Sequence, residues 1–181
     1  IRAIAAPNTG YTFIKWSGIS VTSPTNVNLS YLVGSDAEIK AEFKSPDIYV
    51  RGTNSDWYNS ISGAVAGNDS TGTGSKQRPY ATVSKALSQC TEAGTAYTIF
   101  VDGTIEENTT LNIESGKKVT IVSLRKTTPA VIEEKRVSPT AEQYLVKTAG
   151  TLTLDSVILK ANKTGTHAPD ANTFICGIQQ N

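Results

Sequence analysis

The sequence predicts an all-β protein, in which a small β-repeat module precedes a solenoid of stacked strands that a helix caps at its N-terminal end. From residue 97 onward, short apolar runs alternate with small polar corners, which is typical of a sandwich or of stacked coils. Hairpin signals are scarce, since Asp102-Gly103 is the only Asp-Gly pair and Asn-Gly does not occur. Lys117–Leu124 and Gly150–Leu159 also look like successive turns of one repeating unit, which favours stacked coils.

The first module spans Ile1–Phe43 and consists of short predicted strands. Tyr11–Trp16 alternates strongly between apolar and polar residues, Val27–Tyr31 alternates again, and Ala37–Phe43 supplies a last strand. Tyr11 and Phe13 are expected in an aromatic core, together with either Ile14 or Trp16. Because the module is small and has no cysteine, we expect a thin core that depends on neighbouring parts for stability.

Lys44–Pro46 is the predicted linker, because proline interrupts a strand ladder. Asp47–Val50 then begins a new strand. Trp57 and Tyr58 follow in a polar loop, where two interpretations are open. The pair is either a platform on which a glycan ring stacks or, as we favour, a local anchor that packs back onto the protein.

A helix is predicted at about residues 80–92, after a run rich in Gly, Ser and Thr. Its apolar residues recur every three or four positions: Tyr80, Val83, Leu87 and Cys90. Pro79 suits the start of a helix, Thr82 is the expected N-cap, and Gly94 is the expected C-cap. We interpret this helix as a cap on the first, otherwise open, strands of the solenoid.

After the helix, the chain becomes a series of short strands. Residues 97–101 are apolar throughout, as in a strand that is covered on both faces. The strands are expected at 97–101, 109–113, 119–124, 130–132, 144–146, 151–154, 157–159 and 174–178. Residues 127–140 are interpreted as an insertion between two coils.

The first stretch resembles the divergent internalin-type B-repeat of bacterial surface proteins. The resemblance rests on Ala5–Gly18, where Pro, Gly, aromatic residues, Trp and a second Gly fall in the family's positions, and on the closing Ile39–Phe43. It implies a domain at residues 1–44 that is truncated at its N-terminus, because the family's usual opening strand would precede Ile1. It also implies a spacer or stalk role in extracellular proteins, with no catalytic residues.

The second stretch, residues 47–181, resembles right-handed parallel β-helices of the pectin-lyase-like type. Gly67–Ser70, Gly72–Lys76 and Pro79–Leu87 look like the N-terminal entry of these proteins, while Thr98–Gly103 and Leu152–Leu159 look like their rungs. The resemblance implies a domain that is truncated at its C-terminus after about three rungs. The family includes polysaccharide lyases and hydrolases as well as adhesin-like surface proteins.

The composition excludes several classes of protein. With 17 Lys and Arg against 16 Asp and Glu, the charge is nearly balanced, which argues against nucleic-acid binding. No apolar run is long enough to span a bilayer, so no transmembrane segment is expected. Cys90 and Cys176 are the only cysteines, and we expect either two buried thiols or one disulfide. With His167 as the single histidine, ligands for a zinc site are lacking.

Few residues of this sequence fit a role in the catalysis of a lyase or hydrolase. Asp102, Glu106 and Glu107 form a group that could hold calcium in a lyase, but we favour a turn of solvated polar residues. Glu133–Arg136 reads as a solvated loop, and His167 as an exposed residue of a polar loop. We therefore assign no catalytic, cofactor-binding or metal-binding residue, and expect no cofactor.

These observations predict a piece of a secreted or cell-surface bacterial protein that serves structural display or adhesion. A glycan or a host surface ligand is the expected partner, and the expected location is the cell surface or the extracellular space. The alternative is a carbohydrate-active β-helix enzyme, a lyase or hydrolase, whose catalytic rungs lie beyond Asn181. We do not expect residues 1–181 to be catalytic themselves.

Overall fold

The structure is a computed structural model, which describes residues 1–7, 11–20, 23–32, 34, 36–136 and 145–160, and the backbone of residues 178–180. The predicted strand at 174–178 lies mostly outside these residues. Contacts between Cα atoms divide the chain into two compact units, Ile1–Pro46 and Asp47–Asn181.

The first unit contains two small antiparallel sheets. Strand β1 (Arg2–Ile4) pairs with β3 (Asn28–Ser30), and β2 (Thr12–Ser17) pairs with β4 (Lys40–Lys44). In β1 and β3 only the middle residues are shielded from solvent to any degree. The unit therefore has little interior, as its length predicts.

Trp16 is the centre of the core of the first unit, together with Ala5 and Leu29. The Phe13 ring lies 5.4 Å from the Trp16 ring, with an interplanar angle of 58°. The Trp16 indole nitrogen donates to the Asn26 carbonyl oxygen at 2.9 Å, so the buried polar atom has a partner. Tyr11 was expected in this core, but its residue is 47% exposed, and that prediction is wrong.

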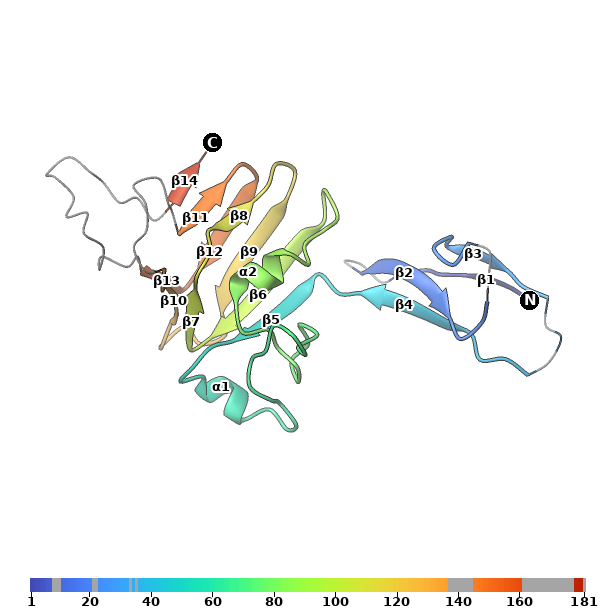
Figure 1. Cartoon of the computed structure of the whole chain (residues 1–181), viewed down its shortest axis with the longest axis horizontal. Helices are drawn as coiled ribbons and strands as arrows, with labels where there is room; N and C mark the ends of the chain where they lie inside the picture. Colours follow the sequence, from blue (N-terminus) through green and yellow to red (C-terminus); the bar gives the residue numbers. More distant parts are fainter. Residues whose placement is uncertain are drawn as a thin grey trace, which may run out of the picture. The chain divides into compact units, whose positions relative to one another are not determined.

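The second unit is built mainly from parallel sheets, with two short helices (Figure 1). Its elements in chain order are β5 (Asp47–Arg51), α1 (Asp56–Asn59), α2 (Val83–Leu87), β6 (Ala96–Asp102), β7 (Thr104–Glu107), β8 (Leu111–Ile113), β9 (Lys118–Ser123), β10 (Ala130–Glu134), β11 (Val146–Thr148), β12 (Thr151–Asp155), β13 (Val157–Lys160) and β14 (Ile178–Gln180). The sheet orders are β12-β9-β6-β5, β13-β10-β7 and β14-β11-β8. Each neighbouring pair of strands is parallel.

Each passage of the chain contributes one strand to each of the three sheets. The first round is β6, β7 and β8, the second is β9, β10 and β11, and the third is β12, β13 and β14. The prediction of parallel strands is therefore confirmed, and a sandwich of antiparallel hairpins is excluded for the described residues of this unit. The expected insertion at 127–140 is only partly described, and β10 occupies Ala130–Glu134 within it. A closed, right-handed solenoid remains a prediction.

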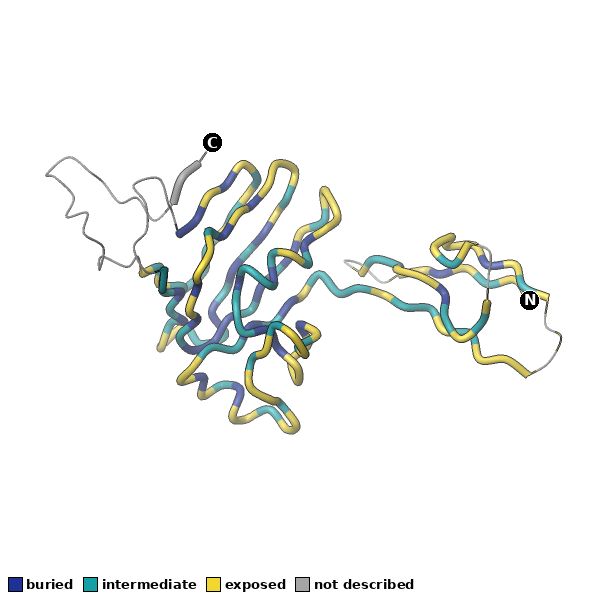
Figure 2. The backbone as a smooth tube through the Cα atoms, in the orientation of Figure 1, coloured by how far each residue is buried: buried dark blue, intermediate teal, exposed yellow. Residues whose placement is uncertain are grey.

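The core of the second unit lies between the sheets, where alternate side chains of strands β5 to β11 are buried, while those of β12 and β13 are at most partly buried (Figure 2). Ile99 on β6 lies in register with Ile121 on β9, and Ile105 on β7 lies in register with Ile132 on β10. Residues 97–101 were expected to be covered on both faces. Thr98 and Phe100 are instead partly exposed, because no element covers the outer face of this sheet among the described residues.

Helix α2 is shorter than the predicted helix at 80–92. Tyr80 lies outside it, in a parallel bridge with Val50 of β5. Its amide donates to the Tyr49 carbonyl oxygen at 2.9 Å, and its carbonyl accepts from the Arg51 amide at 2.9 Å. The backbone of Tyr80 therefore pairs with a strand, and it cannot also take part in a helix.

The ends of α2 confirm one predicted cap and correct the other. The Thr82 hydroxyl accepts from the Lys85 amide at 3.1 Å, as an N-cap does. The helix ends at Ser88, and Gly94, with φ of 81°, lies in a later turn. The α2 residues Val83 and Ala86 are buried, and the helix packs against β5, β7 and β8. Its role as a cap remains a prediction.

Leu87→Asp should destabilise the second unit, because Leu87 packs against the core and an aspartate there would lose hydration. We expect the free energy of unfolding to fall by about 1–3 kcal/mol in urea titrations. Ser88→Asp places the same charge on the neighbouring exposed residue and should change it by less than about 0.5 kcal/mol. Equal effects of the two substitutions would show that the apolar face of α2 does not stabilise the fold.

Candidate functional site

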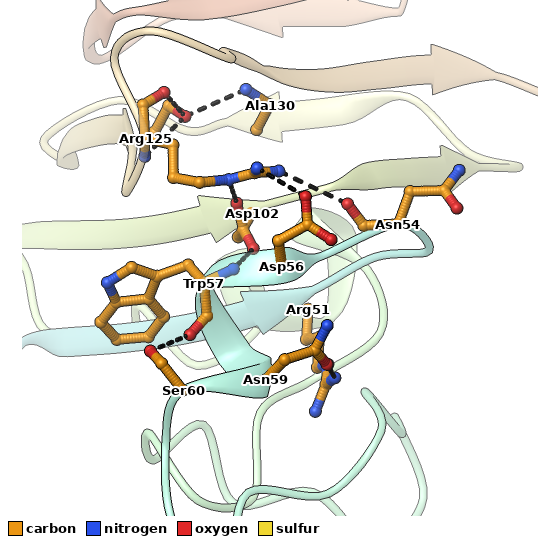
Figure 3. A network of polar contacts seen from close by, with 10 residues as sticks. Arg51, Asn54, Asp56, Trp57, Asn59, Ser60, Asp102, Arg125 and Ala130 are labelled. Carbon is orange, nitrogen blue, oxygen red and sulfur yellow. Dashed lines mark hydrogen bonds and ion pairs between the residues drawn. The ribbon is translucent and has the colours of Figure 1, made fainter.

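The most developed polar network of the second unit surrounds Asp102, the last residue of β6 (Figure 3). The Asp102 side chain is fully buried. One carboxylate oxygen, Oδ1, accepts from Nε of Arg125 at 2.7 Å, and Oδ2 accepts from the backbone amide of Trp57 at 3.1 Å. Both oxygens of this buried carboxylate therefore have partners.

Arg125 uses all three of its side-chain nitrogens in this network. Besides Asp102, it donates from Nη1 to Oδ2 of Asp56 at 2.9 Å and from Nη2 to the carbonyl oxygen of Asn54 at 3.4 Å. The hydrogen bond with Asp102 raises the pKa of the Arg125 guanidinium. The network joins the end of β6, the turn after β9 and the start of α1. We call Asp56, Asp102 and Arg125, with the Trp57 amide, the Asp102 clamp.

Arg51, the last residue of β5, fixes the following loop in a similar way. It donates from Nε to the Ser55 hydroxyl and from Nη2 to Oδ1 of Asn59, both at 2.9 Å, and from Nη1 to the Val65 carbonyl oxygen at 3.1 Å. Its guanidinium carbon lies 5.2 Å from the centre of the Tyr58 ring. One arginine thus holds both α1 and the loop that follows it.

Trp57 and Tyr58 take different roles. Tyr58 is 1% exposed, so it is an anchor, as the favoured interpretation predicts. Burial raises the pKa of its hydroxyl, which has no hydrogen-bond partner among the described residues. The Trp57 ring stands perpendicular to the Tyr58 ring, with centroids 5.0 Å apart, and remains partly exposed. In Figure 3 its indole points away from Arg125.

Glu107, at the end of β7, is also fully buried. Its Oε1 accepts from the amide of Val83 at 2.5 Å and from the amide of Ser84 at 3.3 Å, so it binds the first turn of α2. Its Oε2 has no partner among the described residues. Burial raises the pKa of the Glu107 carboxyl.

The acidic group at residues 102–107 is therefore not the solvated turn that we expected. Asp102 and Glu107 are buried, and only Glu106 is at the surface, with its carboxylate 3.6 Å from the Lys135 ammonium. The three carboxylates also have three separate sets of partners. In the described part of the chain, no three His, Cys, Asp or Glu residues are grouped to hold a metal ion.

Glu133–Arg136 is also not a solvated loop. Glu133 and Glu134 are the last residues of β10, and Glu134 points inward, 3% exposed. Arg136 pairs with Glu134 and donates from Nη1 to the Thr110 hydroxyl at 3.0 Å. This pair is the second buried ion pair of the unit. It links the end of β10 to the corner before β8.

Asp69 is a structural residue that the sequence did not single out. One carboxylate oxygen accepts from the amides of Ala81 and Thr82, at 2.8 and 3.1 Å, and the other accepts from the Thr82 hydroxyl at 2.8 Å. The only signal was its place in a polar run twelve residues before Ala81. A loop contact of that length cannot be derived from periodicity.

The outer face of the sheet β12-β9-β6-β5 carries rows of aligned side chains. The rings of Tyr49 and Phe100 stack with centroids 4.9 Å apart, and the Lys76 ammonium lies 5.5 Å from the Tyr49 ring centre. Thr98 and Thr120 lie in register beside them. Since Tyr49 already stacks on Phe100 and contacts Lys76, this pair does not form an open sugar platform.

Several candidates cannot be placed. His167 and Cys176 lie outside the described residues, so the expectations for them are not tested. Cys90 is buried, with its sulfur 3.6 Å from the Ala86 carbonyl oxygen. The choice between free thiols and a disulfide therefore stays open.

Residues 1–47 match the family model of the divergent InlB B-repeat domain. This repeat is a module of bacterial surface proteins, and the match supports the resemblance in the first unit. No curated protein and no solved structure matched the chain. Among the described residues, no helix is both long enough and apolar enough to cross a membrane.

Arg125→Ala should strongly destabilise the second unit, because it leaves the buried Asp102 carboxylate without its cation. We expect a loss of about 3 kcal/mol in the free energy of unfolding. Asp56→Ala removes the partner at the exposed end of the clamp, where the Asp56 side chain is 75% exposed, and should cost less than about 1 kcal/mol. Similar small losses in both variants, measured by urea unfolding, would show that the clamp is not structural.

Glu107 should make stability fall with rising pH. Its native pKa is raised above the ordinary value of 4.5, so between the two values the native state binds more protons than the unfolded chain. In that interval, the free energy of unfolding decreases as pH rises. Glu107→Gln keeps an oxygen acceptor and removes this titration, so its stability relative to the unchanged chain should increase as pH rises above the ordinary value of 4.5. A constant difference in urea unfolding across this range would contradict the assignment.

Proposed function

We propose that the chain is a display module of a bacterial surface protein, in which a B-repeat precedes the first rounds of a right-handed parallel β-helix. The observation that carries this proposal is the in-register parallel pairing of successive rounds in all three sheets. Such stacking holds an extended surface rigid, which suits the presentation of a ligand contact. The match of residues 1–47 to the InlB-type repeat supports the surface location.

Three buried carboxylates of the second unit are bound by other groups of the protein, which favours a structural role over catalysis. Asp102 is bound by Arg125, Glu134 is bound by Arg136, and Glu107 is bound by the amides at the start of α2. A catalytic acid or base needs an atom that is open to a substrate. In the described residues, Asp102 and Glu107 instead connect segments that are distant in sequence, and Glu134 binds Arg136, which also donates to Thr110.

We further propose that the adhesive contact is to a glycan and that Trp57 contributes to it. Its indole is partly exposed, in contrast to Tyr58. Its backbone is fixed by the Asp102 clamp, so the ring is presented from a rigid base. An exposed indole suits such a contact, because it offers a large apolar face together with one N–H donor.

The surface location can be tested with antibodies raised against residues 1–181. We expect them to label intact cells that naturally produce the protein, and external protease should remove the label. Labelling that requires permeabilised cells would contradict surface display.

Adhesion can be tested by retention of the purified chain on immobilised bacterial and host glycans. Trp57→Ala should lower retention, because it removes the exposed ring, while circular dichroism should show an unchanged fold. Tyr11→Ala is the matched control, since it removes a 47% exposed aromatic side chain from the first unit. Equal retention of all three proteins would exclude Trp57 as the contact. Release of reducing ends or unsaturated sugars from the same glycans would favour a lyase or hydrolase.

A further inference from the structure

The sheets of the second unit differ in what pairs with the outer edge of their first strand. The edge of β5 is paired with the chain itself, since the Tyr49 amide donates to the Gly74 carbonyl at 2.8 Å and Tyr80 bridges Val50. The edge of β7 is bridged by Thr53, which exchanges two backbone hydrogen bonds with Thr104, at 2.9 and 2.7 Å. An unpaired strand edge is a template for another strand, and both of these edges are covered.

Among the described residues, none pairs with the outer edge of β8 in this way. On one side, β8 pairs with β11, and the Leu111 amide donates to the Leu145 carbonyl at 2.8 Å. In a parallel ladder, the backbone groups of successive residues point to opposite sides of the strand. The amide and carbonyl of Asn112 therefore point away from β11. No backbone hydrogen bond from a described residue reaches them.

A cleft of about 420 Å³ borders β8. One wall is formed by α2 and the residues after it, and the other wall is formed by Thr109, Thr110, Asn112–Glu114 and Lys117. Leu87 is partly exposed and supplies apolar surface, whereas Ile113 and Val119 are almost fully buried behind it. Asn112 lies on the wall that contains the unpaired edge. The volume is within the range of ligand-binding clefts.

The charges of the cleft indicate which ligand it favours. The Lys117 ammonium already donates to the carbonyl oxygen of Cys90. Glu114 is exposed, and no described residue forms an ion pair with its carboxylate. A ligand with an apolar group for Leu87 and a cation for Glu114 would match both features.

We propose that this cleft binds an extended basic peptide of a partner protein, which adds to the sheet as a strand beside β8. The backbone of the peptide would pair with the Asn112 amide and carbonyl, an apolar side chain would contact Leu87, and a lysine or arginine would pair with Glu114. Strand addition of this kind gains affinity from main-chain hydrogen bonds and specificity from alternate side chains.

The test is fluorescence polarisation of the whole chain with the labelled pentapeptide Thr-Lys-Val-Lys-Thr. We expect saturable binding that Glu114→Lys weakens about fivefold, as for an exposed ion pair. The charge-reversed peptide Thr-Glu-Val-Glu-Thr should then bind the Glu114→Lys variant better than the unchanged chain. Glu92→Lys is the matched control, because Glu92 is exposed and lies outside the cleft, and it should leave binding unchanged.

Two further measurements separate strand addition from other modes. Ser88→Trp should abolish binding, because Ser88 is an exposed residue of the cleft wall and the indole would fill the cleft, with thermal unfolding as a check of the fold. Bound peptide should slow hydrogen exchange of the Asn112 amide, followed by NMR. No binding, binding unaffected by Ser88→Trp, unchanged exchange at Asn112, or protection of the cleft only by oligosaccharides would each overturn the proposal.

Discussion

The second unit depends on one constraint: the outer edge of the first strand of a parallel sheet needs backbone partners, and β5 and β7 find them within the chain. Helix α2 covers apolar surface there, but its own backbone hydrogen bonds are internal, so it cannot pair with a strand edge. Extended segments at Thr53 and Gly74–Tyr80 do this instead. The need for extended segments beside the strand edges explains why helix α2 is short. The residues before Val83 are needed as backbone partners for β5.

Buried charge is the second organising feature, and it depends on geometry that the sheets provide. Asp102 and Glu134 each lie at the end of a strand, and each is matched by an arginine that follows a strand of the second round. The net gain from such pairs is small, since desolvation offsets most of the attraction. Their main effect is to penalise other arrangements of the corners, because a shifted corner would leave a buried carboxylate unpaired.

Periodicity in the sequence was enough to predict most of the parallel strands, because alternate burial is a local property of each strand. The same alternation also indicates that two acids are buried, although we expected both of them in solvent. Glu107 is in phase with Ile105, and Glu134 is in phase with Ile132, so both side chains point inward with those isoleucines. Our prediction was wrong because it followed the general preference of acids for the surface and not this local alternation. The Asp102 clamp was not predictable, since Arg125 lies 23 residues away and meets Asp102 only through sheet register.

The closed edge beside β5 also gives the stack a direction of growth. Gly67, next to this edge, lies so close to the Arg51 carbonyl that a side-chain carbon there would stand 2.2 Å from its oxygen. The fit leaves no space for an additional strand ahead of β5. On the side of β12 and β13, which pair in register with β9 and β10, a further round can add in the same parallel manner. Proteins built on this plan can therefore vary in length at one end, while the other end keeps a fixed form.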